Sequence, residues 1–227
     1  MTQDPELPPA PVQQTTSEAF LRFALEADVL RFGQFQTKAG RSSPYFFNAG
    51  QFNNGSLLAR LGAFYADTLI QSGLPFDMLF GPAYKGIPLV TSTAIALAHR
   101  HQRTVPIAYN RKEAKEHGEG GTLIGAPLQG RVVIIDDVIS AGTSVYASAE
   151  WIRAANAQLA GVLIALDRQE QGSHSPEGAV REVEKTLAVP VVAIARLEDL
   201  VRLLEQDSVN SQHLPAIRAY RARYGTG

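Results

Sequence analysis

The sequence predicts an α/β fold in which helices flank a mostly parallel β-sheet, and two observations carry this prediction. Several segments, such as residues 131–136 and 158–166, are almost continuously hydrophobic, which is typical of strands buried on both faces. They alternate with longer segments of helical spacing, such as residues 56–72 and 86–101. This alternation favours a parallel sheet that is covered by helices on both faces.

The composition limits the class of protein. The chain has 227 residues, of which 45% are hydrophobic and 19% charged, and this allows one domain with a full core. The net charge of −1 gives no indication of a nucleic-acid or acidic-membrane partner. There is no cysteine, which excludes disulfides and thiolate catalysis and fits a cytoplasmic protein. No apolar run approaches the roughly 20 residues of a membrane-spanning helix, and the first residues lack the pattern of a signal peptide.

The elements of the N-terminal half follow from local signals. Prolines crowd residues 1–15, which are predicted to form a flexible tail. Residues 17–29 place apolar side chains at helical spacing behind Ser17, a suitable N-cap. Two short strands, residues 30–36 and 43–48, are joined by a basic turn that contains a glycine. The pattern then predicts a helix over 56–72 capped by Asn54 or Ser56, a strand over 77–80, a helix over 86–101 and a strand over 105–109.

The C-terminal half continues the alternation. Residues 110–127 follow neither period and are rich in charge and glycine, so they are predicted to form a long loop. The pattern then predicts a strand over 131–136, a helix over 143–155, a strand over 158–166, a polar loop over 167–178, a strand over 189–195 and helices over 197–205 and 214–224. There is no internal repeat and no second core, so residues 16–227 are predicted to form one domain with an N-terminal cap.

The segment VVIIDDVISAGTSV places two carboxylates, Asp136 and Asp137, at the end of a buried strand. In a parallel sheet, ligands bind beyond the carboxyl ends of the strands. The next helix begins near Thr143, and a helix N-terminus binds phosphate through free N–H groups and the helix dipole. Ala141 and Gly142 allow the backbone to approach such a ligand closely.

Two acids beside a phosphate cradle repel phosphate, but they suit the sugar attached to it. Carboxylates accept hydrogen bonds from a vicinal diol, and they bind Mg²⁺ directly or through water. Ser140, Thr143 and Ser144 add hydroxyl donors for the phosphate. We therefore interpret the segment as a ribose-5-phosphate clamp, and the simpler alternative is a helix-capping turn. The motifs G-x-x-x-x-G-K-[ST] and G-x-G-x-x-G are absent.

This segment resembles the phosphoribosyl pyrophosphate (PRPP) motif of type I phosphoribosyltransferases. With four further segments, FQTKAGRSSPYFFN, GPAYKGIP, NRKEAKEHGEGG and LDR, the chain resembles the orotate phosphoribosyltransferase family over residues 17–168. The resemblance implies the type I phosphoribosyltransferase fold, with an N-terminal hood over residues 30–50 and a flexible catalytic loop over residues 110–124. It also implies a Mg²⁺-dependent transfer of the 5-phosphoribosyl group from PRPP to N1 of orotate, a step of pyrimidine (UMP) biosynthesis.

The resemblance also implies the residues that bind PRPP. They are Lys38, Tyr84, Lys85, Arg111, Lys112, Lys115, His117, Asp136, Asp137, Val138, Ile139, Ser140, Ala141, Gly142, Thr143 and Ser144. Catalytic roles are implied for Lys85 and Lys115 at the leaving pyrophosphate, and for Asp136 and Asp137 at the ribose. A charge run such as residues 110–121 is most often a solvated surface, but here three cations and a histidine precede glycines that suit a hinged loop.

Orotate binding is implied for Phe46, Phe47, Ser140 and Arg168. Orotate is a flat aromatic anion, so a pair of rings offers a stacking wall. Neighbours on a strand point to opposite sides, and one of the two rings is therefore expected in the core. An arginine binds a carboxylate through two parallel hydrogen bonds, and uracil and the purines lack that carboxylate. The family usually has threonine at the position of Ser140, and the hydroxyl is kept.

The resemblance extends to partners and cofactors. Family members are homodimers in which the catalytic loop of one protomer contributes residues to the site of its partner. Mg²⁺ is expected to be carried by the pyrophosphate of PRPP, with no direct protein ligand and contact to Asp136 and Asp137 through water. Apart from His117, the histidines (His99, His101, His174 and His213) have no other metal ligands at a suitable spacing.

Three alternatives stay open at this point. The first is a transferase that acts on a purine, uracil or xanthine. The second is a non-catalytic PRPP-sensing regulator of the same fold, which would lose the loop cations and carry a basic surface. The third is one half of a fusion with a decarboxylase, and the chain has no second barrel-sized region for it.

Overall fold

The structure is a computed structural model that describes residues 15–37, 40–115, 121–171 and 177–226. None of the helices in these ranges is long and apolar enough to cross a membrane. In chain order the elements are α1 (Thr16–Glu26), β1 (Leu30–Gln36), β2 (Ser42–Phe47), η1 (Ala49–Gln51), α2 (Gly55–Gln71), β3 (Met78–Gly81), α3 (Gly86–His101), β4 (Ile107–Lys115), β5 (Gly121–Gly125), β6 (Arg131–Asp136), α4 (Thr143–Ala154), β7 (Gln158–Asp167), α5 (Ala179–Leu187), β8 (Val191–Arg196), α6 (Leu197–Gln206), η2 (Ser211–His213) and α7 (Leu214–Tyr224).

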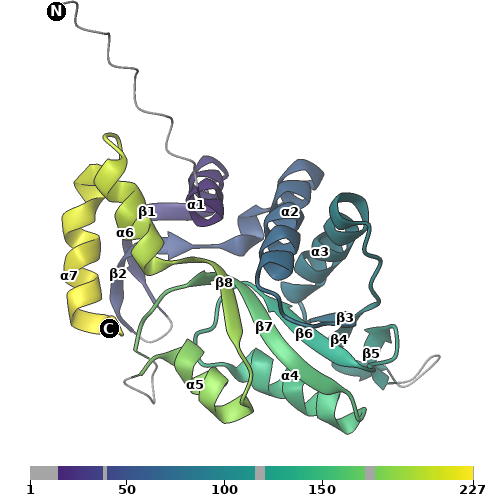
Figure 1. Cartoon of the computed structure of the whole chain (residues 1–227). Coiled ribbons are helices and arrows are strands. Elements are labelled where there is room, and N and C mark those ends of the chain that lie inside the picture. Colours follow the sequence, from purple (N-terminus) through teal and green to yellow (C-terminus); the bar gives the residue numbers. More distant parts are fainter. Residues whose placement is uncertain (1–14, 38–39, 116–120, 172–176, 227) are drawn as a thin grey trace, which may run out of the picture.

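Six strands form one sheet in the order β5-β4-β3-β6-β7-β8. Four neighbouring pairs are parallel, and only the pairing of β5 with β4 is antiparallel. Helices α2 and α3 lie over one face of the sheet, and α4 and α5 lie over the other (Figure 1). The predicted fold, a mostly parallel sheet flanked by helices, is therefore confirmed.

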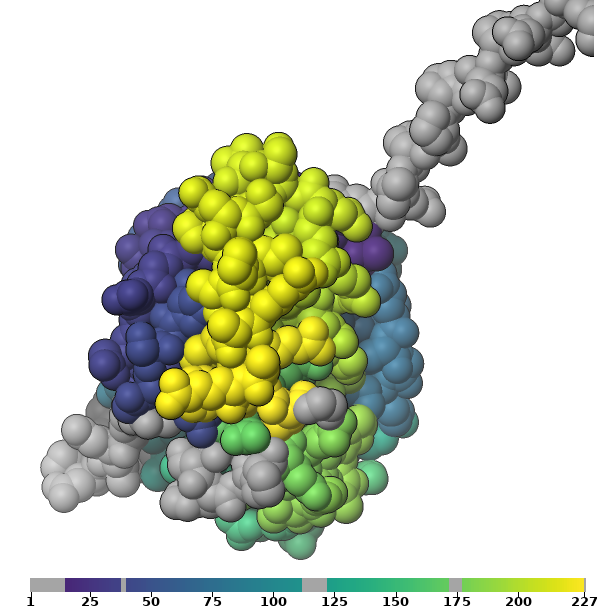
Figure 2. Space-filling model, turned by 90° about the vertical axis from the view of Figure 1, so that its left-hand side faces the viewer, coloured from purple at the N-terminus to yellow at the C-terminus, as the bar shows by residue number. Residues whose placement is uncertain are grey.

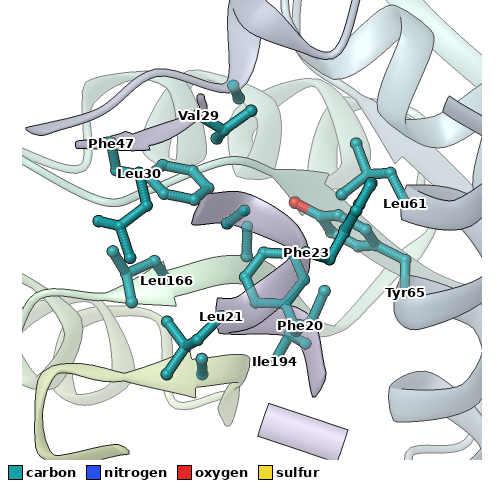
Figure 3. Packing of buried hydrophobic residues seen from close by; sticks show 14 of the residues in the cluster. Phe20, Leu21, Phe23, Val29, Leu30, Phe47, Leu61, Tyr65, Leu166 and Ile194 are labelled. Carbon is teal, nitrogen blue, oxygen red and sulfur yellow. The ribbon is translucent and has the colours of Figure 1, made fainter. Parts of the chain in front are cut away.

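Each face of the sheet carries its own hydrophobic cluster, because side chains alternate along a strand. On β6, Val133 and Ile135 belong to the cluster beneath α1, α2 and α3, whereas Val132 and Ile134 belong to the cluster beneath α4 and α5. All four side chains are fully buried. Figure 3 shows the first cluster, in which aromatic rings of α1 and α2 meet side chains of β7 and β8. Burial on both faces explains why the strands are continuously apolar.

Strands β1 and β2 form a separate antiparallel hairpin, which we call the hood. Along β2, Ser43, Tyr45 and Phe47 are buried, and the residues between them are partly exposed. Helices α6 and α7 lie beside the hood and cover one end of the molecule (Figure 2). The N-terminal and C-terminal parts of the chain therefore build the same region.

The prediction of a loop over residues 110–127 is wrong. Strand β4 continues to Lys115, and β5 returns antiparallel to it, with Tyr109 opposite Ile124. Strand β5 is an edge of the sheet. The charged residues lie on the outer part of β4, which continues past its last pairing with β3 at Tyr109 and pairs there with β5 alone. This part of the hairpin therefore lacks the alternating apolar pattern by which a strand is recognised.

Two smaller predictions at helices are also corrected. The N-cap of α1 is Thr15 and not Ser17, because the Thr15 hydroxyl accepts a hydrogen bond from the backbone N–H of Glu18. Helix α5 is absent from the predicted elements. It has nine residues, buries only Val183 and Leu187, and has no side-chain cap. So short a helix depends on packing and leaves a weak signal in the sequence.

Candidate active site

The acidic pair lies at the end of β6, and both side chains are buried. Asp136 Oδ1 accepts the backbone N–H of Asp137 at 2.9 Å, and Asp136 Oδ2 accepts the hydroxyl of Ser144 at 2.8 Å. Asp137 Oδ1 accepts the backbone N–H of Val138 at 2.9 Å, and Asp137 Oδ2 accepts the ammonium of Lys85 at 2.6 Å. Each carboxylate oxygen therefore has one partner, and both groups are held in a fixed orientation.

The surroundings of Asp136 change the pKa of its carboxyl group. Burial, followed by the charge of Asp137, raises the pKa of Asp136 from 3.8 to about 6. Hydrogen bonds from Ser144 and the backbone oppose the rise. Beneath the pair, the hydroxyl of the buried Tyr65 on α2 donates to the backbone oxygen of Asp136 at 2.8 Å. Because neutral pH lies above this raised pKa, Asp136 is mostly ionised there and can accept hydrogen bonds from a ligand.

The residues after the pair form an open loop that leads into α4. Gly142 is the N-cap of α4 with φ of +70°, and a Cβ there would lie 2.7 Å from the ring of Tyr146. Both the backbone conformation and the space therefore require glycine. Val138 is partly buried and Ile139 is buried, and they anchor the loop. The exposed residues of the loop are Ser140, Ala141, Thr143 and Ser144.

A second loop, between β3 and α3, adjoins the first because β3 and β6 are neighbours in the sheet. Its two ends meet closely: a Cβ on Gly81 would lie 2.3 Å from the carbonyl oxygen of Gly86. The buried Asn110 on β4 holds this loop from the other side, since its side-chain oxygen accepts the backbone N–H of Ala83 at 2.7 Å. Glycine at both ends and the buried amide therefore fix the loop.

The structure describes the side chains of only some of the cations that are expected to bind PRPP. The side chain of Lys85 is 54% exposed and reaches Asp137, and Tyr84 beside it is exposed. Arg111 Nη1 is buried and has no hydrogen-bond partner among the described residues, which leaves a charged donor for an anion. The backbone of β4 includes two further expected residues, Lys112 and Lys115, whose side chains lie outside the described part. Lys38 and His117 also lie outside the described residues.

Arg168 follows β7 and is fixed between β7 and the hood. Its Nε and Nη2 atoms lie 2.8 and 2.7 Å from Glu170 Oε1, and Nη2 donates to Ser43 Oγ at 3.1 Å. The guanidinium lies 4.4 Å from the ring centroid of Tyr45. Burial alone would lower the pKa of Arg168, but Tyr45 and Glu170 raise it above its ordinary value. The side chain therefore stays charged.

The two phenylalanines of the hood have different environments. Phe47 belongs to the core, with its ring centroid 6.3 Å from that of Phe20 (Figure 3). Phe46 is partly exposed and stacks on Phe35 across the hairpin, with centroids 5.3 Å apart. The expectation that one of the two rings lies in the core is therefore confirmed for Phe47, and the ring of Phe46 is the one left for a stacking wall.

Sequence reasoning missed several residues that shape this region: Ser43, Tyr45, Tyr65, Asn110 and Glu170. The period of two places Ser43 and Tyr45 on the same face of β2 as Phe47, so the strand pattern contains a signal for them. The contact of Arg168 with Ser43 joins residues 125 positions apart, and such pairing leaves no local signal in a single sequence.

Proteins of known family share the sequence of this chain over most of its length. A model of the phosphoribosyl transferase domain matches residues 48–194. An orotate phosphoribosyltransferase of Stutzerimonas stutzeri is 59% identical over 213 residues, which cover 93% of this chain and 99% of the relative. The chain belongs to the orotate phosphoribosyltransferase family. A second such relative, from Bordetella petrii, is 61% identical over 217 residues and covers 92% of this chain and 96% of its own length.

A solved structure agrees with the family assignment. The crystal structure of orotate phosphoribosyltransferase from Francisella tularensis matches with a TM-score of 0.81 and 40% identity, over 91% of this chain and 99% of that one. This chain is therefore a phosphoribosyltransferase of pyrimidine biosynthesis. The alternatives of another acceptor base and of a PRPP-sensing regulator do not fit these relatives.

Proposed function

We propose that the enzyme transfers the 5-phosphoribosyl group of PRPP to N1 of orotate. A bond forms between N1 and C1 of the ribose, and the bond from C1 to the pyrophosphate oxygen breaks with inversion. Pyrophosphate leaves with the bonding electrons, orotate N1 loses its proton, and the product is orotidine 5′-monophosphate. No protein nucleophile is required, so catalysis consists of positioning and charge stabilisation.

One observation carries this proposal: the acidic pair, Lys85 and Arg168 occupy the same edge of the sheet. They follow three neighbouring strands, β6, β3 and β7, at their carboxyl ends. The backbone N–H of Ala165 donates to the carbonyl oxygen of Asp137 at 2.9 Å, which joins the end of β7 to the acidic pair. Groups suited to a ribose, a pyrophosphate and a carboxylate are thus gathered in one region.

Asp136 and Asp137 are proposed to bind the ribose hydroxyls and to offset positive charge on the ring in an oxocarbenium-like transition state. Their four oxygens already have protein partners in fixed directions, and each oxygen accepts a second hydrogen bond through its remaining lone pair. The exposed loop that leads into α4 is proposed to bind the 5-phosphate with its hydroxyls and backbone N–H groups. The ribose phosphate would thus be held at both ends.

The leaving pyrophosphate is proposed to be stabilised by Lys85, by Arg111 and by Lys112, Lys115 and His117 of the β4–β5 hairpin. The ammonium of Lys85 is half-exposed beside Asp137, so it can contact both the protein and a ligand. The buried Nη1 of Arg111 lacks a partner among the described residues, which fits an anion as its missing contact. Lys38 is proposed to reach PRPP from the hood.

Mg²⁺ is proposed as the cofactor, carried by PRPP. Each oxygen of the acidic pair has one protein partner and keeps a further lone pair, so it can accept a hydrogen bond from a water molecule on the metal. No group of three or more metal-ligating side chains occurs in the described part of the chain. Contact through water to Asp136 and Asp137 satisfies both facts. When bound, Mg²⁺ supplies positive charge to the pyrophosphate oxygens.

Orotate is proposed to bind between the hood and Arg168. The guanidinium would pair with the carboxylate of orotate, and the Phe46 ring would lie against the flat base. Ser140 would add a hydroxyl, and Phe47 would contribute its backbone only. We further propose that the enzyme acts in the cytoplasm as a homodimer, with residues of the hairpin entering the partner's site.

The test follows the absorbance of orotate with purified enzyme, PRPP and Mg²⁺, beside uracil, adenine and hypoxanthine as controls. The proposal expects orotate absorbance to fall only when both PRPP and Mg²⁺ are present, and the control bases to stay unchanged. Turnover of another base in place of orotate would keep the ribose-phosphate clamp and refute the roles of Phe46 and Arg168. Orotate turnover that is unchanged by a metal chelator would refute the role of Mg²⁺.

A further inference from the structure

Glu170 has no role in the proposed reaction, yet its carboxylate lies beside the residue expected to read the substrate. The side chains of Arg168 and Glu170 are only 16% and 15% exposed. A carboxylate buried this deeply costs free energy unless it is paired, so its position next to Arg168 is a constrained feature of the site.

The contacts of Glu170 are confined to one edge of the guanidinium. Glu170 Oε1 receives both Nε and Nη2 of Arg168, at 2.8 and 2.7 Å. The hydroxyl of Tyr45 donates to the same oxygen at 3.3 Å, and Nη2 donates also to Ser43. Among the described residues, the hydrogen bonds of the guanidinium come from Nε and Nη2, and Nη1 donates none. The hydroxyl of Tyr220 on α7 is also near enough for the charge of Arg168 to lower its pKa, against the larger effect of burial. One edge is therefore fixed by protein groups, and the other is left for a ligand.

Further residues keep Glu170 in place. Its backbone forms an isolated antiparallel bridge with Gly225 at the end of α7. Tyr220 on α7 packs edge-on against Tyr45, with ring centroids 6.3 Å apart and an interplanar angle of 87°. Burial raises the pKa of Tyr220, and the negative charge of Glu170 adds to the rise. The C-terminal helix α7 thus packs against the residues that hold the Arg168–Glu170 ion pair.

We propose that Glu170 is a positioning residue that fixes Arg168 with its Nη1 edge toward the carboxylate of the base, and so sets specificity for a carboxylated base. The inference rests on the proposed role of Arg168 in binding orotate. A free guanidinium on a flexible side chain would lose rotamer entropy on binding. A guanidinium already fixed at one edge loses less and accepts a carboxylate in one orientation only.

A rival account makes Glu170 a competitor that orotate must displace. Such a competitor would occupy the edge open to the ligand. Glu170 instead shares its edge with Ser43 and Tyr45, which are both buried. The two accounts differ in sign: removal of a competitor would tighten orotate binding, and removal of a positioning residue would weaken it.

The experiment compares Arg168→Ala, Glu170→Ala, Glu170→Gln and the double variant Arg168→Ala/Glu170→Ala. For each variant, the KM values for orotate and PRPP, the kcat and the unfolding temperature are measured. Asp77→Asn is the matched control, because Asp77 also accepts two hydrogen bonds from one arginine, Arg131, but lies at the amino end of β3.

Glu170→Ala is expected to raise the KM for orotate by about ten- to hundredfold, the range for loss of hydrogen bonds to a charged group, with the KM for PRPP unchanged. Glu170→Gln keeps an acceptor at the same place and should recover part of the loss. The double variant should be no worse than Arg168→Ala, because Glu170 acts through Arg168. Asp77→Asn should leave both KM values unchanged.

The outcomes separate this inference from the proposed function. If Arg168→Ala leaves the KM for orotate unchanged, the proposed orotate site is wrong, and the inference is wrong with it. If Arg168→Ala raises that KM but Glu170→Ala leaves it unchanged or lowers it, only the inference is refuted. Equal losses in both KM values, together with a lower unfolding temperature, would make Glu170 a general structural residue and would also refute the inference.

Discussion

At the scale of single residues, two adjacent aspartates in one turn have different partners. Asp137 pairs with the Lys85 ammonium, whereas Asp136 is bonded to a hydroxyl and a backbone N–H. Burial and the charge of Asp137 together raise the pKa of Asp136 to about 6. The raised pKa means that the folded protein without ligand is destabilised by the ionised form of Asp136. A buried anion is kept here at a cost in stability, as is common at functional sites.

This cost predicts an unusual effect of Asp136→Asn. Because the folded pKa of Asp136 lies above its unfolded value, its contribution to the free energy of unfolding falls as pH rises from about 4 to about 6, and then stays low. Asparagine keeps the shape without the charge. The variant should be more stable than the parent at pH 7 by on the order of 2–3 kcal/mol, and nearly equal at pH 4. It should also lose activity.

Urea unfolding between pH 4 and pH 8 measures this difference, and Asp77→Asn provides a control of opposite sign. Hydrogen bonds from Arg131 lower the pKa of Asp77 below its ordinary value of 3.8. That substitution should therefore destabilise the protein by a similar amount throughout pH 4 to 8, and its effect should fade only at more acidic pH. A gain for Asp136→Asn that is independent of pH would contradict the account of Asp136.

At the scale of elements, boundaries were predicted well where a chemical signal marked them. Strand β6 and helices α3 and α7 have the predicted bounds, because a continuous apolar run defines β6 and glycine or proline marks the start of the two helices. The β4–β5 hairpin was missed because the outer part of β4 is charged and has no apolar alternation, and α5 was missed because it is a short helix held by packing. The acidic pair and Lys85 adjoin recognisable motifs, whereas Glu170 gains its role only through contacts across the fold.

Strand β3 and helix α3 approach each other so closely at Gly81 that adding one methyl group there should lower the stability of the protein. A Cβ on Gly81 would lie 2.3 Å from the carbonyl oxygen of Gly86, and backbone atoms must shift to make room. Gly81→Ala should lower the free energy of unfolding by about 3 kcal/mol or more. Gly55→Ala, in the first turn of α2 where no atom lies within 4 Å, should raise it by up to about 1 kcal/mol.

Chemical unfolding of both glycine variants provides the measurement. Activity should fall in Gly81→Ala together with stability, since the loop that carries Lys85 begins at this glycine. Equal stabilities of the two variants would show that the loop yields easily, and would contradict a rigid support for Lys85.

At the scale of the whole molecule, segments from both ends of the chain meet at Arg168. The hood brings Ser43 and Tyr45 to its guanidinium, and α7 packs behind them through Tyr220. The acidic pair and Lys85 lie at the carboxyl edge of the sheet, on the same edge as Arg168. A site assembled from such distant segments requires the complete fold, which explains why its motifs are scattered over the sequence.

The proposed dimer predicts that two inactive variants restore activity when mixed. Lys115→Ala should lower kcat by about a hundredfold or more through loss of charge at the pyrophosphate, and Asp137→Asn should inactivate the ribose site. If the hairpin serves the partner's site, each mixed dimer contains one intact site. An equal mixture after subunit exchange should regain roughly a quarter of the parental activity. No regain, with exchange shown by mass spectrometry, would place the hairpin in its own protomer's site.

The central claim is that one ligand spans the acidic pair and Arg168, and a crystal structure with orotidine 5′-monophosphate tests it most directly. The account predicts the phosphate at the loop before α4, the ribose hydroxyls on Asp136 and Asp137, and the base carboxylate about 2.7–2.9 Å from Arg168. A complex in which the ribose phosphate occupies that loop but the carboxylate lies away from Arg168 would contradict the account of base recognition. A ligand bound elsewhere would contradict the site as a whole.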